Sequence, residues 1–137
     1  MRRGIRWLPL ALGVLWAAAA VAGAPEWADL AALDTIEVVT ADEDGDARET
    51  TVWIAVLEGA AYVRTGSTTW GENLARNPEL VLRAGEDSWP LRVEFVEDDA
   101  LRQRITDAFR EKYGFSDRMV SWMRGSRPKI MRLVARE

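Results

Sequence analysis

The 137-residue chain contains no cysteine and no histidine. Without cysteine it can form no disulfide, no thiol nucleophile and no thiolate site for zinc or an iron–sulfur cluster. Without histidine it can form neither a Ser-His-Asp triad nor the common imidazole zinc sites. Any chemistry must therefore come from carboxylates, Lys, Tyr, Ser or Thr, or from a bound cofactor. Such a poor side-chain repertoire favours a cofactor.

A long uncharged run lies at the N-terminus, over residues 7–25, after Arg2, Arg3 and Arg6. A basic start, an apolar middle and small residues at the end are typical of a secretory signal peptide, here with Ala20-Val21-Ala22 as the cleavage triplet. The run is also long enough for an uncleaved membrane anchor, which would leave the rest outside the cytoplasm. A mis-assigned start near Glu26 is the third interpretation, and it would make the protein cytoplasmic.

The rest of the chain is acidic. The whole chain has a net charge of −4, and without its first 22 residues 15 basic side chains stand against 22 acidic ones. The net charge of that part is then −7. No face combining basic and aromatic residues is evident in it, so we expect no nucleic-acid partner.

Residues 26–137 are expected to form one domain that is mainly β, of the α+β class. Strand patterns occur six times, and hairpin connections without βαβ alternation favour a small antiparallel barrel. We predict strands over 35–41, 50–57, 61–65, 80–84, 88–97 and 128–136. We predict a short N-terminal helix over 27–34, a short mid-chain helix over 70–76, and two helices before the last strand, over 98–114 and 116–125.

Two details of this pattern carry further expectations. The segment TTVWIAVL, residues 50–57, is apolar on both faces, which predicts one continuous strand in the middle of the sheet. The segment DEDGD, residues 42–46, predicts a solvated hairpin tip. It is not a calcium loop, because its glycine is misplaced and no acidic residue stands at the bidentate position.

The stretch from Thr50 to Pro78 resembles the split-barrel flavin-binding superfamily of pyridoxamine-phosphate oxidases and deazaflavin-dependent nitroreductases. The matching motifs are Thr50-Thr51-Val52-Trp53, Tyr62-Val63-Arg64-Thr65, and Asn73-Leu74 followed by Asn77-Pro78. The likeness extends over residues 27–136, and the tail resembles a branch that is a domain of unknown function. It implies a six-stranded antiparallel split β-barrel.

The resemblance also implies a cofactor, flavin mononucleotide (FMN) or a deazaflavin coenzyme. Its phosphate would lie at the loop after the Tyr-Val-x-Thr strand and at the start of the next helix, and its ring against the hairpin, often at the interface of a homodimer. The side chains suit this role, because Arg64 can pair with a phosphate, hydroxyls can donate to it, and a helix start adds free N–H groups. The implied cofactor-binding residues are Thr51, Trp53, Arg64, Thr65, Gly66, Ser67, Thr68, Trp70 and Asn73.

Simpler interpretations accompany each of these residues. The segment 64–69 is also what a solvated loop with a helix capped by Thr68 or Thr69 looks like. Trp53 fits a core position, and Trp70 could equally cover the end of the barrel. Tyr113, Trp122 and Met123 have the spacing of packing residues. Arg124, Arg127 and Lys129 suit a solvated surface, a cofactor phosphate or a partner chain.

Two functions from different classes therefore stay open. The first is a flavin- or deazaflavin-binding oxidoreductase-like protein of unknown substrate, with no catalytic residue assigned. The second is a non-catalytic split-barrel binding module or dimerisation domain. The second is favoured by a departure from the superfamily, because Trp70, Gly71 and Glu72 stand where many flavin-binding members carry a basic residue.

Overall fold

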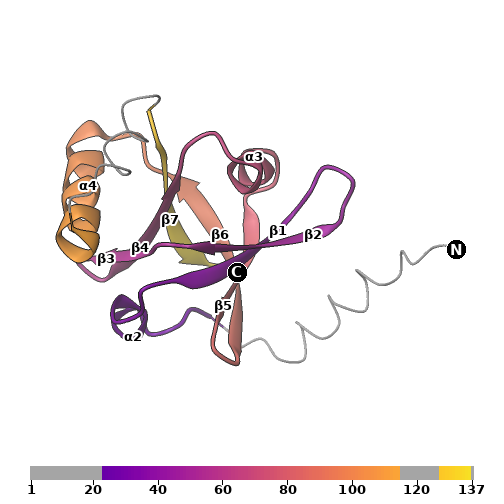
Figure 1. The fold of residues 1–137 in the computed structure, drawn as a ribbon, viewed down its shortest axis with the longest axis horizontal. Helices are drawn as coiled ribbons and strands as arrows, with labels where there is room; N and C mark the ends of the chain where they lie inside the picture. The colour runs from indigo at the N-terminus through magenta and orange to yellow at the C-terminus, as the bar shows by residue number, and fades with distance from the viewer. Residues whose placement is uncertain (1–22, 115–126, 137) are drawn as a thin grey trace, which may run out of the picture.

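The structure is a computed structural model that describes residues 23–114 and 127–136 (Figure 1). The helix expected over 116–125 lies outside the described residues, as do Trp122, Met123, Arg124 and most of the N-terminal segment. In the part that is described, no helix combines the length and apolar character that crossing a membrane requires.

Three helices and seven strands make up the described chain. The helices are α2 (Trp27–Ala31), α3 (Thr69–Arg76) and α4 (Asp99–Tyr113). The strands are β1 (Ile36–Ala41), β2 (Ala47–Val52), β3 (Ala55–Leu57), β4 (Ala60–Thr65), β5 (Glu79–Ala84), β6 (Asp87–Phe95) and β7 (Lys129–Ala135). The prediction of a mainly antiparallel β domain with attached helices is confirmed, with one strand more than expected.

All seven strands belong to one antiparallel sheet, in the order β2-β1-β5-β6-β7-β4-β3. Its two outermost strands, β2 and β3, follow each other in the chain and are separated only by Trp53 and Ile54. The sheet must therefore curl until its two edges nearly meet, which gives the open barrel of Figure 1.

The extra strand corrects the expectation of one continuous strand over 50–57 in the middle of the sheet. The segment changes partner at Trp53: Val52 pairs with Ile36 of β1, whereas Ala55 pairs with Tyr62 of β4. The hydrophobic pattern runs through this corner because Val52, Ile54 and Ala55 are buried on either side of the exposed Trp53. The pattern cannot show that the partner strand has changed.

Sequence signals placed the helix ends well. The side chain of Thr68 caps α3 by accepting a hydrogen bond from the Gly71 N–H at 3.1 Å. Asp98 caps α4 by accepting from the Leu101 N–H at 2.8 Å. Gly114 ends α4 with a φ of 82°, a conformation that favours glycine.

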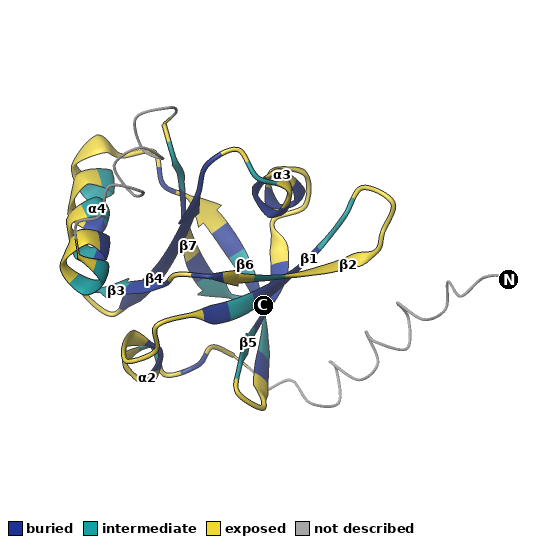
Figure 2. Cartoon of the chain, in the orientation of Figure 1, coloured by how far each residue is buried: buried dark blue, intermediate teal, exposed yellow. Residues whose placement is uncertain are grey.

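The barrel wall packs on both of its faces. Along β4, Ala61 and Val63 join the cluster inside the barrel, whereas Ala60 and Tyr62 join a second cluster beneath α4. That alternation explains why every residue of β4 is buried (Figure 2). The tip of the β1–β2 hairpin is exposed, as predicted.

Candidate functional site

The corner between β2 and β3 presents a tryptophan to solvent. Trp53 is 40% exposed, although its ring stacks on Tyr113 of α4 with 4.1 Å between centroids and 3° between planes. The phenol ring covers one face of the indole, and the residue keeps an exposed surface. We call Trp53 and Tyr113 the ring platform. The hypothesis that Trp53 is a core residue is wrong.

Helix α4 fixes the ring platform through the main chain of the corner. The Tyr113 hydroxyl accepts from the Ile54 N–H at 3.0 Å and donates to the carbonyl oxygen of Asp34 at 2.7 Å. Lys112 Nζ donates to the carbonyl oxygen of Ile54 at 2.8 Å. Side chains therefore satisfy backbone groups that a neighbouring strand would otherwise satisfy. Burial raises the pKa of Tyr113 above its ordinary value.

Thr51 lies beside this corner, two residues before Trp53 on the outermost strand β2. It is exposed, and its hydroxyl donates to Glu37 Oε2 at 3.4 Å. Thr51 and Trp53 are the two residues predicted to contact the ring, and both are exposed near this corner.

Arg64 occupies a different place from the one that a shared phosphate site requires. Its side chain is 8% exposed and its guanidinium lies over the Phe109 ring of α4, 4.2 Å from the centroid. Burial, together with the nearby charge of Arg110, lowers its pKa to about 10. The Arg64 side chain lies on the same face of β4 as Ala60 and Tyr62, which is the face beneath α4. The adjacent Thr65 lies against the start of α3.

The remaining loop residues gather at the start of α3, where two of the hydroxyls bond to each other. The hydroxyls of Thr65 and Thr68 bond to each other at 2.5 Å, and Thr68 also caps the helix. A Cβ added to Gly71 would lie 2.7 Å from Thr65 Cγ2, so this glycine permits the close approach of α3 to β4. Gly66 is buried and Ser67 is exposed. Trp70 is 7% exposed and packs inside the barrel.

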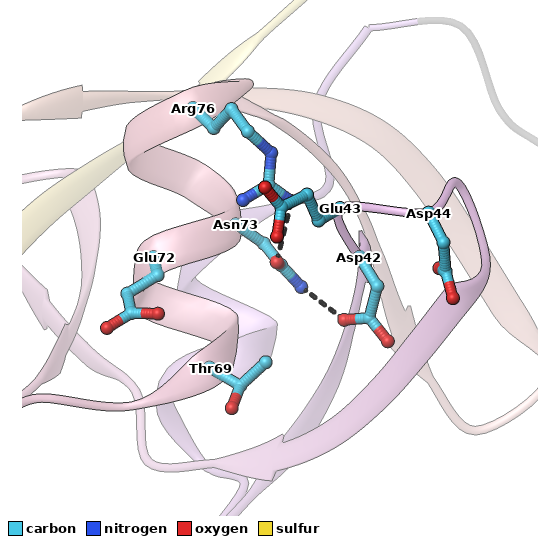
Figure 3. A pocket seen from close by; sticks show the side chains of 7 residues that line it. All are labelled: Asp42, Glu43, Asp44, Thr69, Glu72, Asn73 and Arg76. Carbon is cyan, nitrogen blue, oxygen red and sulfur yellow. Dashed lines mark hydrogen bonds between the residues drawn. The ribbon is translucent and has the colours of Figure 1, made fainter.

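An open cleft of about 430 Å³ lies between α3 and the hairpin tip (Figure 3). It is lined by Asp42, Glu43, Asp44, Thr69, Glu72, Asn73 and Arg76. The predicted site residue Asn73 points into it and bridges its two walls.

The bridge is a polar network that leaves the Asn73 amide fully engaged. Asn73 Nδ2 donates to Thr40 Oγ1 at 3.0 Å and to Asp42 Oδ1 at 2.8 Å, and Asn73 Oδ1 accepts from Arg76 Nη2 at 2.9 Å. Arg48 Nε donates to Asp42 Oδ1 at 2.7 Å. The hydrogen bonds from Arg48 and Asn73 lower the pKa of Asp42. Nothing in the described ranges groups three or more acidic side chains so that they could hold a metal ion.

The two halves of the expected cofactor site fit unequally. A flat ring fits the ring platform, because Trp53 is partly exposed and its stack on Tyr113 holds it in one orientation. The start of α3 suits a phosphate less well: the hydroxyls of Thr65 and Thr68 bond to each other, Arg64 lies over Phe109 of α4, and Glu72 stands in the first helical turn.

Sequence reasoning missed the part that Tyr113 and Lys112 play at the corner. Tyr113 was assigned to packing, and its spacing of four residues from Phe109 does place both rings on one side of α4, with centroids 6.1 Å apart. Its hydrogen bonds to residues 34 and 54 connect segments far apart in the chain, so no local pattern carries them.

Comparison with solved structures defines the class of protein. The chain is similar to the conserved hypothetical protein Rv2991 from Mycobacterium tuberculosis, at 24% identity and a TM-score of 0.66, covering 88% of this chain and 84% of that one. It is similar to HutZ, the heme storage protein from Vibrio cholerae, at 14% identity and a TM-score of 0.65, covering 85% and 92%. It is also similar to an F420-H2 dependent reductase (FDR-A), at 13% identity and a TM-score of 0.59, covering 73% and 93%.

These likenesses confirm the split-barrel fold. Within that class, residues 26–133 match the family described as "Uncharacterized protein conserved in bacteria (DUF2255)", and the chain belongs to this family. Among curated proteins, none matches the chain.

Proposed function

We propose that the chain binds a flavin or deazaflavin coenzyme, whose ring stacks on Trp53 beside Thr51. The observation that carries this proposal is the exposed indole held parallel to Tyr113 at 4.1 Å. An exposed tryptophan that packing and hydrogen bonds hold in one orientation is pre-organised for a planar ligand, so little conformational entropy is lost on binding. Similarity to an F420-H2 dependent reductase supports this choice of ring.

Haem suits this chain less well, although one similar structure is a heme storage protein. Haem iron is commonly held by His or Cys, and the sequence has neither. Of its two tyrosines, Tyr62 is 4% exposed and the Tyr113 hydroxyl is bonded to the main chain. A ligand bound through its ring rather than through a metal matches these side chains.

A bound flavin or deazaflavin would supply hydride transfer, for which the chain itself has no redox-active side chain. Trp53 would bind one face of the ring, and Tyr113 would act through Trp53 as a positioning residue. Its hydroxyl donates to the carbonyl oxygen of Asp34, which fixes the ring against the corner. We assign no catalytic residue.

A second candidate function is a non-catalytic binding module, with or without a homodimer partner. It is favoured by the position of Arg64 over Phe109 and by Glu72 at the start of α3, since these two features leave little to hold a phosphate.

Titration of the full chain with FMN and with a deazaflavin coenzyme, following the fluorescence of the ligand, tests the proposal. We expect saturable binding of one of them at micromolar levels. Replacing Trp53 by Leu should weaken it about tenfold or more, because the stacking surface is lost. The matched control is Trp89→Phe, a half-buried tryptophan of β6 that packs against the barrel interior.

The outcomes separate the two candidates. No saturable binding of either ligand would rule out the coenzyme and leave the binding module. Binding that the Trp53 variant retains in full would place the ring elsewhere. Size exclusion of the same samples tests the predicted homodimer.

A further inference from the structure

Acidic side chains lie near the start of α3, and they disfavour a ligand that carries an anionic phosphate there. We infer that this chain recognises the ring of its ligand and not the phosphate, so that it binds riboflavin at least as tightly as FMN. The inference rests on the proposed function and gives it a ligand class: a flavin ring without an anionic tail.

Two hydroxyls of the loop, those of Thr65 and Thr68, bond to each other. Thr65 and Thr68 share a hydrogen bond of 2.5 Å, and Thr68 Oγ1 accepts from the Gly71 N–H. This bond uses one of the two hydroxyl protons, so the pair can offer a phosphate one donor as it stands and a second only if the bond breaks. The cost of breaking the bond would offset much of what the second hydrogen bond gains.

The cation expected to pair with the phosphate faces the other way. Arg64 is adjacent to Thr65 in β4, and successive side chains of a strand point to opposite faces. The guanidinium lies over Phe109 beneath α4. Arg64 therefore cannot reach a group bound between Thr65 and the first turn of α3 without leaving its buried position.

Carboxylates dominate the other side of α3. Glu72 is exposed in the first turn, and Asp42, Glu43 and Asp44 lie across the cleft (Figure 3). The two arginines here are already engaged: Arg48 bonds Asp42, whereas Arg76 Nη2 donates to the Ala41 carbonyl oxygen at 3.0 Å and to Asn73. A dianion entering this region would meet net negative charge.

One basic residue stands close to the loop by strand register. Lys129, the first residue of β7, pairs with Thr65 of β4. It is half-buried, and its ammonium group could pair with a phosphate bound at this loop. The experiment must therefore include it.

The test compares riboflavin with FMN on the full chain, by titration at low and at high salt. A phosphate held by two charge-assisted hydrogen bonds would favour FMN by roughly 100-fold or more, with a strong loss in salt. We expect riboflavin to bind as tightly as FMN or up to about tenfold more tightly, with FMN gaining as salt screens the carboxylates. If the deazaflavin ring is the ligand, its phosphate-free form replaces riboflavin in the comparison.

Two charge variants sharpen the comparison. Glu72→Lys should shift the preference towards FMN by about tenfold, since it replaces a repulsive charge by an attractive one. Glu86→Lys makes the same charge change in the exposed β5–β6 turn and should leave the ratio unchanged. Lys129→Met should leave the ratio unchanged as well.

Several results would overturn the inference. Preference for FMN of 100-fold or more would refute it while the proposed function stands, and loss of that preference in Lys129→Met would assign the phosphate to β7. A ratio that Glu72→Lys and Glu86→Lys shift equally would show that only net charge matters. Failure of all flavins and deazaflavins to bind would refute the proposed function, and the inference with it.

Discussion

Two corners of the barrel are each held by a helix, and they use different chemistry. Helix α4 holds the β2–β3 corner with a stacked ring and with hydrogen bonds to the backbone of Ile54. Helix α3 holds the β1–β2 hairpin with the amide of Asn73, which bonds Thr40 and Asp42. The first corner leaves an aromatic face open, whereas the second uses its polar groups to satisfy one another. Residue type alone therefore does not show which polar or aromatic groups are available to a ligand.

The largest effect is expected at the α3 corner. Asn73→Ala removes a 3% exposed amide together with its three hydrogen bonds. It should lower the free energy of unfolding by about 2–3 kcal/mol, because partners are left without a bond in a buried setting. Chemical denaturation of the full chain measures it.

The control for this prediction is Asn77→Ala, at the exposed residue that follows α3. It should cost less than about 0.5 kcal/mol. Equal losses from the two variants would mean that the Asn73 network does not stabilise the hairpin.

A smaller effect is expected at the α4 corner. Tyr113→Phe keeps the stacked ring but removes the hydroxyl that bonds Ile54 and Asp34. We expect a loss of about 1–2 kcal/mol in the free energy of unfolding. Ligand binding should weaken as well, since Trp53 would be less firmly oriented.

Tyr62→Phe is the matched control, because its hydroxyl takes no part in these contacts. Ligand affinity equal to that of the wild type in Tyr62→Phe, together with weakened affinity in Tyr113→Phe, would identify Tyr113 as a positioning residue. Two variants that unfold at the same denaturant concentration and bind the ligand equally would contradict that role.

The smallest effect is expected in the pH dependence of stability that Asp42 contributes at the α3 corner. The pKa of Asp42 is lowered from its ordinary value of 3.8, first by the hydrogen bond from Arg48 and then by that from Asn73. A lowered folded-state pKa adds stability above the unfolded-state value, and this stability disappears as the pH falls through the folded-state value. The difference in stability between the wild type and Asp42→Asn should therefore shrink below about pH 4.

The measurement is urea unfolding of both proteins from neutral to strongly acidic pH. Salt should reduce the difference at neutral pH, because the pair is exposed. A difference that stays constant across the acid range would show that Asp42 titrates normally in the folded protein.

Much of the fold was predictable because its signals are local. Helix caps at Thr68 and Asp98 need only the neighbouring residues, and so does the glycine that ends α4. The orientation of Arg64 was also predictable in principle. Strand alternation places residues 64 and 65 on opposite faces of β4, although the motif suggested one shared site.

Other features were not predictable in this way. The break at Trp53 arises because β2 pairs with β1 whereas β3 pairs with β4. This pairing depends on the closure of the whole sheet and not on the local sequence. The exposure of Trp53 depends on Tyr113, which is sixty residues away along the chain. The occupation of Thr65 and Thr68 depends on how closely Gly71 lets α3 approach β4.

The sequence by itself determined the class of the protein: an antiparallel barrel with a capped mid-chain helix, poor in catalytic side chains and resembling the split-barrel superfamily. Alternating burial, turn residues and caps act over a few residues, so they can be read without coordinates. Only the tertiary structure decided which of the expected site residues remain accessible. Contacts between segments distant in the chain occupy some hydrogen-bond donors and ring faces. Tertiary packing therefore determines which of these groups stay accessible to a ligand.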